Sequence, residues 1–483
     1  MASMPLMSQP MISVAGIRGI VGDSLTPDSF LQYLLAFATL ADGRPVVLGC
    51  DSRLSRDMLR HLAFAALSSA GCDVIDIGMA CTPTVGIMVK ELKAGGGIAV
   101  TASHNPSQWN AYKFFGPDGC FLSREKNTEL LAICETQRYR RASYRNLGRV
   151  RPLEGSAHTH LKRVLAAVDL SGVPARRFKV VVDCVNGVGA SVIGPLLEKL
   201  KCQVVYIDND PTQEFPRNPE PLPENLTGLC DAVIAENADI GFAVDPDGDR
   251  LAIVDETGRA IGEERTIVLA ADALLSGLGR APLPPNSTES DLDAAPAPKG
   301  PIVVNLSTTR AIDDVAVKHG VDLYRTPIGE ANVVEAILEA EALVGGEGNG
   351  GVIFPNVHPG RDAATGVALV LAHLAAHGGK ASELNATIPD YVMVKQKSGA
   401  DDLDPSTLSG RMRVEFVDAE RISAEDGIKA DYADCWVHLR PSGTEPVVRI
   451  FAEAPDAEKA AALVMRVRQK VLLKKGIDFT QMG

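Results

Sequence analysis

The sequence predicts an α/β protein with three similar α/β domains, each with a mixed or parallel sheet, and a C-terminal α+β domain around a central cleft. Three observations lead to this prediction. Strand and helix patterns alternate through most of the chain, a polar or glycine-rich loop follows the third strand of each repeat, and the pattern changes after about residue 375. Because loops at the carboxyl ends of parallel strands build the sites of α/β proteins, these loops are expected to converge on one cleft.

Each repeat has the order strand, helix, strand, helix, strand, which is typical of parallel α/β units. The first strand of each repeat is an apolar run that ends in small or polar residues. The expected first, second and third strands lie within 46–53, 74–78 and 97–106; 180–190, 204–208 and 240–250; and 302–311, 321–326 and 343–351. A chance likeness of valine-rich strands is the alternative, but the three loops also share their place in the pattern.

Four domains are expected from these patterns, and their boundaries are predicted at residues 1–155, 156–257, 258–375 and 376–483. The stretch 280–300 is rich in Pro, Ala, Ser and Asp, so it is expected to be a flexible insertion in the third domain. The fourth domain is expected to alternate strands and to end in a helix that starts near Asp456.

The composition limits the possible functions. The chain has 483 residues, 46% of them hydrophobic, and a net charge of −13. This acidic balance argues against nucleic-acid and anionic-membrane partners, although a basic pocket could still hold a small anion. The nine cysteines include no C-x-x-C pair, so neither a zinc site nor a disulfide framework is indicated. No secretory signal or apolar run of about 18 residues is visible, and a cytoplasmic setting is expected.

The stretch TASHNP (101–106) places a serine in a loop directly after an apolar strand. Ser103 is the candidate nucleophile, because a nucleophile needs an exposed hydroxyl on a rigid loop and a partner for its proton. Lys113 can neutralise a phosphate or shuttle a proton. His104 would point away from Ser103 in an extended loop, so it is expected as a hydrogen-bonding partner more than as a base. Arg18, between the glycines of GIRG, is a further candidate anion contact.

The stretch DPDGDR sets Asp245, Asp247 and Asp249 at alternate positions. Three carboxylates this close repel one another unless a cation lies among them, and oxygen ligands favour Mg²⁺, Mn²⁺ or Ca²⁺. An EF-hand is one alternative, but Arg250 stands where its loop needs glycine, and a hairpin is expected to follow. A solvated acidic turn is the other alternative. A catalytic magnesium loop is the favoured interpretation.

The stretch GEGNGG (346–351) matches G-x-G-x-x-G, which is a weak signal by itself. Because VIFPN follows where that motif requires a helix, dinucleotide binding is rejected. Glu347 and Asn349 then remain as polar side chains on a glycine loop, and they suit paired sugar hydroxyls. A plain glycine-rich turn is the alternative.

The stretch RPSGTEP joins two expected strands of the last domain and is a candidate phosphate-binding loop. Arg440 offers a planar bidentate donor for phosphate. Ser442, Thr444 and the backbone around Gly443 can complete an anion nest, and Arg449 can assist. A purely structural turn is the alternative.

Together, a serine, an aspartate triplet, a sugar loop and a phosphate loop indicate phosphoryl transfer on a phosphosugar. No P-loop or kinase signature is present, so ATP is not the expected donor. At this point the chain resembles the α-D-phosphohexomutase family, which includes phosphoglucomutase, phosphomannomutase and phosphoglucosamine mutase. GIRG, TASHNP, DPDGDR, GEGNGG and RPSGTEP match it in order and spacing over almost the entire chain.

The resemblance implies that Ser103 carries a phosphoryl group, gives it to the substrate, and regains the other phosphate of the resulting bisphosphorylated sugar. It implies one Mg²⁺ held by the aspartate triplet and a phosphoserine oxygen, with a hexose 1,6-bisphosphate as activator. A monomer or homodimer that binds a sugar phosphate is expected. The resemblance places Arg18, Lys113 and Arg250 near the transferring group and Thr326, Glu347 and Asn349 near the sugar.

The sugar loop departs from the common family pattern GE-x-S-G-H. Asn349 replaces the serine and Gly351 replaces the histidine, so no role of that histidine carries over. The loop looks like variants in archaeal and some bacterial members, where phosphoglucosamine mutases and mixed glucose/mannose enzymes both occur. Conversion of glucosamine 6-phosphate to glucosamine 1-phosphate is the expected reaction, and glucose or mannose phosphates are the alternative.

Two other functions are compatible with a serine in a sugar-phosphate site. A sugar phosphatase would result if water reached phosphorylated Ser103, but a four-domain enclosure is expected to exclude water. A non-catalytic sugar-phosphate-binding protein is the second, and it is disfavoured because every expected chemical group except the loop histidine is present.

Overall fold

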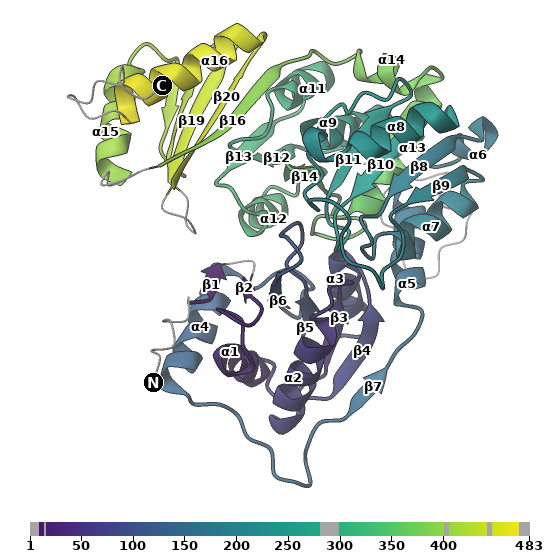
Figure 1. The fold of residues 1–483 in the computed structure, drawn as a ribbon, viewed down its shortest axis with the longest axis vertical. Helices are drawn as coiled ribbons and strands as arrows, with labels where there is room; N and C mark the ends of the chain where they lie inside the picture. Colours follow the sequence, from purple (N-terminus) through teal and green to yellow (C-terminus); the bar gives the residue numbers. More distant parts are fainter. Residues whose placement is uncertain (1–8, 14–15, 281–298, 400–404, 442–446, 473–483) are drawn as a thin grey trace.

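The computed structural model has four β-sheets that follow one another along the chain (Figure 1). The structure describes residues 9–13, 16–280, 299–399, 405–441 and 447–472. Most of the expected 280–300 insertion therefore lies outside the described residues. None of the described helices has the length and apolar character needed to cross a membrane.

The first three sheets share one strand order, so the expected repeat is confirmed. In each, the first strand lies between the second and third and runs parallel to both, and an antiparallel fourth strand follows the third. The matching orders are β4-β3-β5-β6, β9-β8-β10-β11 and β13-β12-β14-β15. The sheets are therefore mixed, and each candidate loop of these units connects a third strand to its antiparallel neighbour.

The first unit extends this pattern to seven strands by adding β1 and β2 beyond β6 and β7 beyond β4. Its strands are β1 (Met11–Ser13), β2 (Gly16–Ile20), β3 (Val46–Cys50), β4 (Val74–Met79), β5 (Gly96–Val100), β6 (Trp109–Phe115) and β7 (Val150–Pro152). Its helices are α1 (Pro27–Leu40), α2 (Arg56–Ser69), α3 (Thr82–Glu91) and α4 (Arg124–Thr136). Every residue of β3 and β5 is buried, as an apolar run between two helical layers requires.

The second and third units are four-stranded. The second contains β8 (Lys179–Asp183), β9 (Gln203–Ile207), β10 (Ile240–Val244), β11 (Leu251–Asp255), α5 (Ser156–Ala167), α6 (Val173–Arg176), α7 (Ala190–Lys199) and α8 (Thr227–Glu236). The third contains β12 (Ile302–Asn305), β13 (Leu323–Thr326), β14 (Val344–Glu347), β15 (Gly351–Ile353), α9 (Glu264–Ala273), α11 (Ala311–His319), α12 (Glu330–Glu339), α13 (Ala363–His377) and α14 (Ala381–Asn385).

The fourth unit is a five-stranded antiparallel sheet with the order β16-β20-β19-β18-β17. Its elements are β16 (Val392–Gly399), β17 (Arg421–Ser423), β18 (Ile428–Asp431), β19 (Trp436–Pro441), β20 (Val447–Ala454), α15 (Pro405–Glu415) and α16 (Ala457–Arg466). Asp456 caps α16 by accepting a hydrogen bond from the Lys459 amide, so this helix starts where the sequence placed it. In Figure 1 this unit lies beside the third unit, near β13 and α11.

A shared core joins the second and third units. The helix α13, which is buried over most of its length, packs against α9 of the third unit and against α5 and α7 of the second. The first and fourth units have cores of their own. The loops that leave β10 and β14 are therefore fixed relative to one another by a continuous apolar core.

Candidate active site

The loop after β5 holds Ser103 in a strained conformation. Ser103 has a φ of +50°, which is the left-handed region that only a minority of non-glycine residues adopt. Its amide donates to Thr101 Oγ1 at 2.9 Å, and its Oγ donates to Asp245 Oδ2 of the second unit at 2.7 Å. The loop is not extended, and His104 Nδ1 lies 3.4 Å from Ser103 Oγ. Strain of this kind concentrates at functional sites.

A buried arginine that the sequence analysis missed holds this loop. Arg53 is 2% exposed. Its two terminal nitrogens donate to four backbone carbonyls, that of the serine and those of three residues after it, at 2.6–2.9 Å. Its Nε donates to Asp51 at 3.1 Å. The four acceptors are the carbonyls of Ser103, Asn105, Pro106 and Trp109. Arg53 therefore fixes the backbone that presents the Ser103 hydroxyl.

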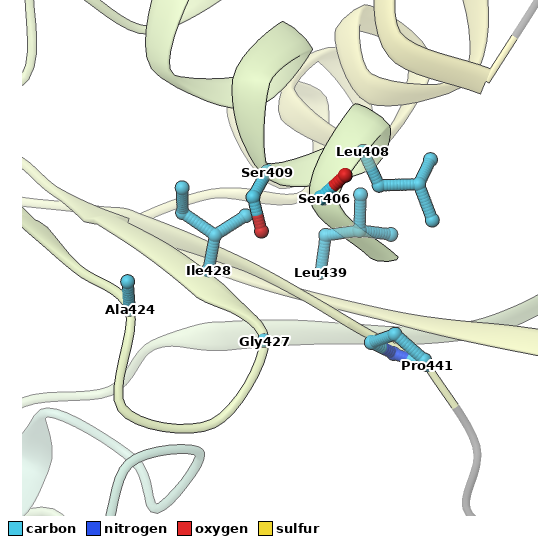
Figure 2. Close-up of a pocket in the computed structure, with 8 residues that line it drawn as sticks. All are labelled: Ser406, Leu408, Ser409, Ala424, Gly427, Ile428, Leu439 and Pro441. Atoms are coloured by element: carbon cyan, nitrogen blue, oxygen red, sulfur yellow. The ribbon is translucent and has the colours of Figure 1, made fainter. Parts of the chain in front are cut away.

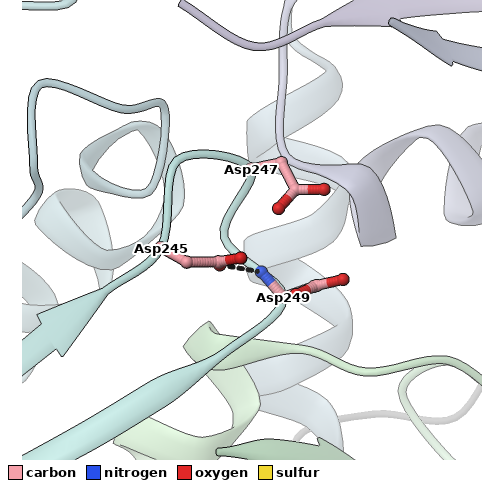
Figure 3. Close-up of side chains that lie close together, drawn as sticks. All are labelled: Asp245, Asp247 and Asp249. Carbon is pink, nitrogen blue, oxygen red and sulfur yellow. Dashed lines mark hydrogen bonds between the residues drawn. The ribbon is translucent and has the colours of Figure 1, made fainter. Parts of the chain in front are cut away.

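The loop after β10 gathers the three predicted carboxylates (Figure 3). One ligand oxygen from each of Asp245, Asp247 and Asp249 lies within 4.8 Å of the others, and all three residues are buried. Asp245 Oδ1 accepts hydrogen bonds from the amides of Asp249 and Arg250, each at 3.0 Å. Gly248 has a φ of +71° and would place a Cβ 2.7 Å from Cys81 Sγ, so only glycine fits this turn.

Side chains of the first unit also bind the aspartate loop of the second unit. Thr82, at the start of α3, donates its hydroxyl to Asp247 Oδ2 at 2.5 Å, and its amide donates to the Asp247 carbonyl at 2.9 Å. Lys113 Nζ donates to Asp247 Oδ2 at 2.7 Å and lies 3.5 Å from Asp249 Oδ2. The aspartate triplet, Ser103 and Lys113 therefore form one cluster between the first two units.

The carboxylates are not equivalent in their protonation. Burial and the charges of Asp249 and Asp247 raise the pKa of Asp245 well above its usual value. Burial also acts to raise the pKa of Asp247, but Lys113 outweighs it and lowers that pKa. Burial also acts to raise the pKa of Asp249, but the net shift is downward, mainly because of the charge of Arg361. Asp245 therefore favours its protonated form, whereas Asp247 and Asp249 are ionised and each is paired with a cation.

This donor set fits a divalent cation. Asp247 Oδ1 and Asp249 Oδ1 are buried and have no hydrogen-bond partner among the described residues. Orphaned buried carboxylate oxygens are costly unless a cation or proton satisfies them. Oxygen-only ligands of this kind suit Mg²⁺, Mn²⁺ or Ca²⁺ rather than zinc. The buried aspartate cluster can therefore hold a metal ion.

Basic groups lie near His104, the chain neighbour of Ser103. Arg250 is 8% exposed, and its Nε has no hydrogen-bond acceptor within the part of the chain that the structure describes. Burial and the charges of Arg250 and Arg361 lower the pKa of Arg18, which places Arg18 in the same cluster. Burial and the charge of Arg250 lower the pKa of His104 well below its usual value, so its imidazole is neutral.

The loop after β14 presents Glu347, which is 2% exposed. Its Oε1 accepts hydrogen bonds from Asn305 Nδ2 at 2.9 Å and the Gly329 amide at 3.1 Å. Its Oε2 accepts from Asn349 Nδ2 at 3.3 Å and from Arg361 Nη1 at 3.0 Å. Burial raises the pKa of Glu347, but Arg361 and these hydrogen bonds outweigh it, so Glu347 is ionised.

Thr326 lies beside this loop. It ends β13, pairs in register with Asn305 of β12, and donates its hydroxyl to the Pro327 carbonyl at 2.9 Å. Because Asn305 also donates to Glu347, Thr326 and Glu347 share one edge of the third sheet. The structure thus brings together Thr326, Glu347 and Asn349, which the sequence assigned to sugar binding.

Arg440 comes from the fourth unit. Its Nε donates to Asp426 Oδ1 at 2.7 Å, and the other oxygen of Asp426 accepts from the Ile328 amide at 2.9 Å. Asp426 therefore links Arg440 to the segment that follows Thr326. Arg449 lies opposite Arg440 across the β19–β20 pair. The predicted residues Ser442, Gly443 and Thr444 lie outside the described residues.

A cavity of about 260 Å³ lies nearby in the fourth unit, between α15 and the ends of β18 and β19 (Figure 2). Its lining is mainly apolar and includes Leu408, Ile428 and Leu439. None of its lining side chains is titratable, so the chemistry is not placed there.

The fold and the site define a class: a four-unit α/β enzyme with a serine, a cation-binding aspartate cluster and a buried carboxylate loop at the ends of three related sheets. Family models of phosphoglucomutase/phosphomannomutase match each unit in turn. The α/β/α domains I, II and III match residues 11–141, 158–258 and 289–391, and the C-terminal domain matches residues 390–470.

Individual relatives cover nearly the whole chain. It is 36% identical over 451 residues to the "Phosphoglucomutase/phosphomannomutase" of Thermococcus kodakarensis, covering 92% of this chain and 94% of that one. It is 35% identical over 454 residues to a "Probable phosphoglucosamine mutase" of Methanopyrus kandleri, covering 93% of this chain and 95% of that one. A crystal structure of a phosphoglucomutase/phosphomannomutase family protein from Burkholderia thailandensis superposes with a TM-score of 0.79 at 26% identity, covering 95% and 97%.

The chain belongs to the phosphoglucomutase/phosphomannomutase family, and the predicted family and four-domain α/β fold are confirmed. Its members are phosphohexomutases, which are isomerases. The exact boundaries predicted for the four domains, and the roles of the individual site residues, stay predictions.

Proposed function

We propose that this chain interconverts hexose 6-phosphates and hexose 1-phosphates through a phosphorylated Ser103. One observation carries the proposal. The Ser103 hydroxyl is held by a strained loop at 2.7 Å from Asp245, inside a cluster of three buried aspartates and Lys113. A hydroxyl that only stabilised a turn would need neither the aspartates nor the Arg53 clamp.

In the first transfer, the phosphoryl group leaves Ser103 for a free hydroxyl of the bound hexose monophosphate. The Ser103 Oγ–P bond breaks, a P–O bond to the sugar oxygen forms, and in the net balance the proton of the sugar hydroxyl replaces the one that Ser103 Oγ takes up. Burial acts to lower the pKa of Lys113, but Asp247 and Asp249 outweigh it and raise it, so Lys113 enters the reaction as an ammonium. Its proposed role is to balance the charge of the transferring group and to supply a proton at Ser103 Oγ.

In the second transfer, the hexose 1,6-bisphosphate turns within the site and returns its other phosphoryl group to Ser103. The bonds that broke and formed in the first step do so in reverse, at the other end of the sugar. A Mg²⁺ ion held by Asp245, Asp247 and Asp249, with a phosphoserine oxygen, would supply Lewis-acid stabilisation of the phosphoryl oxygens. Free hexose 1,6-bisphosphate serves as activator because it can phosphorylate Ser103.

The remaining residues bind the two ends of the substrate. Arg18 and Arg250 face the transferring phosphoryl group, where the buried Nε of Arg250 has no protein acceptor among the described residues. Neutral His104 acts as a hydrogen-bonding partner of Ser103. The groups proposed to hold the sugar are Thr326, Glu347 and Asn349, and those proposed for the distal phosphate are Arg440, Ser442, Gly443, Thr444 and Arg449.

Glucosamine 6-phosphate is the proposed substrate, with glucosamine 1-phosphate as product. The loop GEGNGG supports it by resemblance, and the Methanopyrus kandleri relative carries the name phosphoglucosamine mutase. The Thermococcus kodakarensis relative, at 36% identity, carries the name phosphoglucomutase/phosphomannomutase. Glucose and mannose phosphates are therefore the second candidate pair.

A panel assay tests this proposal. Glucosamine, glucose, mannose and N-acetylglucosamine 6-phosphates are supplied with Mg²⁺ and the matching 1,6-bisphosphate, and isomer formation and inorganic phosphate are measured together. The proposal predicts isomer without phosphate release and the highest kcat/KM for glucosamine phosphate. A higher kcat/KM for glucose or mannose phosphate would reverse the substrate assignment. Phosphate release in place of isomer would make the chain a phosphatase. If neither isomer nor phosphate forms, the chain is a sugar-phosphate-binding protein. Sedimentation of the full chain tests the predicted monomer or homodimer.

A further inference from the structure

Arg361 lies between the aspartate loop and the glycine loop, and no sequence motif drew attention to it. It directly precedes Asp362, the N-cap of α13. Its Nη2 donates to Asp249 Oδ2 at 2.7 Å, and its Nη1 donates to Glu347 Oε2 at 3.0 Å. Its Nε lies 3.0 Å from Glu330 Oε2. One guanidinium thus spans three carboxylates from two units, with only 9% of its side chain exposed.

The glycine loop is shaped around this side chain. A Cβ at Gly351 would lie 2.2 Å from Arg361 Cδ and 2.9 Å from Arg361 Cγ. Gly351 is not in the left-handed region, so the need for glycine here comes from the approach of Arg361 rather than from the backbone angle. The apolar stem of Arg361 therefore fills the space beside the loop, and its head reaches the carboxylates.

The two oxygens of Glu347 are held differently. Oε1 is fixed by two neutral donors of its own unit, Asn305 and the Gly329 amide. Oε2 has the long contact with Asn349 and the charged contact with Arg361, so Arg361 is its strongest partner. The orientation of this carboxylate therefore depends on Arg361.

We propose that Arg361 is a positioning residue that orients Glu347 for the sugar and fixes the sugar loop at a set distance from the aspartate loop. This inference rests on the proposed function, because it assumes that Glu347 binds the sugar. Arg361 acts through Glu347 and Asp249, and it bridges the loop that holds the sugar and the loop beside Ser103. Substitutions here are expected to weaken sugar-phosphate binding even when no phosphoryl transfer takes place.

Binding is measured without turnover in a Ser103→Ala background. Titration calorimetry with glucosamine 6-phosphate, and in parallel with glucose 6-phosphate, compares Arg361 with Arg361→Lys. Lysine keeps the charge, but a single ammonium cannot serve three carboxylates. We expect Kd to rise about tenfold or more, with a thermal unfolding midpoint close to that of the parent. An unchanged Kd in Arg361→Lys would overturn the inference.

A double-mutant cycle separates positioning from general destabilisation. If Arg361 acts through Glu347, then Arg361→Gln should weaken binding strongly in the parent and only slightly once Glu347→Gln is present. If the increase in Kd of the double variant equals the product of the increases in the two single variants, the inference is wrong. The control is Arg265→Gln, because Arg265 is also buried and donates to backbone carbonyls of residues 385, 388 and 389, away from Glu347. We expect Arg265→Gln to lower stability without coupling to Glu347→Gln.

Gly351→Ala gives a test that removes no charge. Its methyl group should displace the Arg361 stem, so it should reproduce the binding loss of Arg361→Lys and add little in the Glu347→Gln background. Full binding by Gly351→Ala would contradict the packing argument. These binding results stand apart from the panel assay. A wild-type chain without mutase activity would refute the proposed function, whereas normal mutase activity with unaffected Arg361→Lys binding would refute only this inference.

Discussion

Replacing Arg53 should lower both the stability of the fold and the kcat of the enzyme, and the fall in kcat is the effect specific to this site. Arg53→Ala removes five hydrogen bonds, four to the carbonyls of Ser103 and of residues after it and one of 3.1 Å to Asp51. At about 1 kcal/mol for each net hydrogen bond, the loss of stability is about 5 kcal/mol. Relaxation of the strained Ser103 backbone by about 1 Å would lower kcat about 100-fold.

The assay compares Arg53→Ala and Arg53→Lys with Arg265→Ala, a matched loss of a buried arginine that clamps loop carbonyls elsewhere. Urea unfolding gives the stability of each variant, and the coupled mutase assay gives kcat at a temperature where every variant is folded. We expect a similar stability loss in both alanine variants but a large fall in kcat only at Arg53. If Arg265→Ala loses as much kcat as Arg53→Ala, or if folded Arg53→Ala keeps wild-type kcat, the reasoning about the serine loop is refuted.

Three further predictions follow from other contacts. Mg²⁺ at 100 times its Kd should stabilise the wild type against thermal unfolding by about 2.7 kcal/mol. Asp247→Asn should lose most of this stabilisation. An equal stabilisation of the variant would exclude the aspartate triplet as the Mg²⁺ site. Burial raises the pKa of Glu264 to about 7, well above the value of about 4.3 for a free glutamate, so the folded state binds the extra proton and stability should fall by roughly 3 kcal/mol as pH rises from about 4.5 to 7. Glu264→Gln should flatten this slope in urea unfolding, and an unchanged slope would reject the assignment. Asp426→Ala removes the 2.7 Å hydrogen bond that holds Arg440 and leaves the Ile328 amide without its acceptor. The KM for the sugar phosphate should therefore rise about tenfold, with little change in kcat. A fall in kcat with an unchanged KM would contradict this prediction.

Local sequence was enough to find the repeat and the loops. Runs such as GGIAV before TASHNP and IGFAV before DPDGDR mark a buried strand and the residue where it ends. The shared place of the loops then predicted that they would meet, and Ser103 does lie 2.7 Å from Asp245 although 142 residues separate them. The sequence did not predict the antiparallel fourth strand of the three sheets; after DPDGDR it predicted a hairpin within residues 251–261, and β11 pairs with β10.

The residues that the sequence did not reveal act across long separations. Arg53 binds a carbonyl 50 residues away, Thr82 binds Asp247 over 165 residues, and Arg361 binds Asp249 over 112. Their local surroundings are ordinary helix starts and turns. Arg361 in particular stands ten residues after Gly351, and only the folded chain shows that its stem occupies the space of the missing Cβ. Charged residues whose partners are distant in the sequence produce no periodic pattern in the local sequence, so the sequence alone did not identify them.

The phosphorylation state of Ser103 during turnover tests the central claim most directly. Enzyme incubated with Mg²⁺ and hexose 1,6-bisphosphate labelled in its phosphates would be digested and its peptides sequenced by mass spectrometry, before and after a single turnover with unlabelled hexose 6-phosphate. We predict label on the peptide that contains Ser103, and its transfer to the sugar within one turnover. Label on another residue, or a Ser103→Ala enzyme that still isomerises hexose phosphates, would contradict the account.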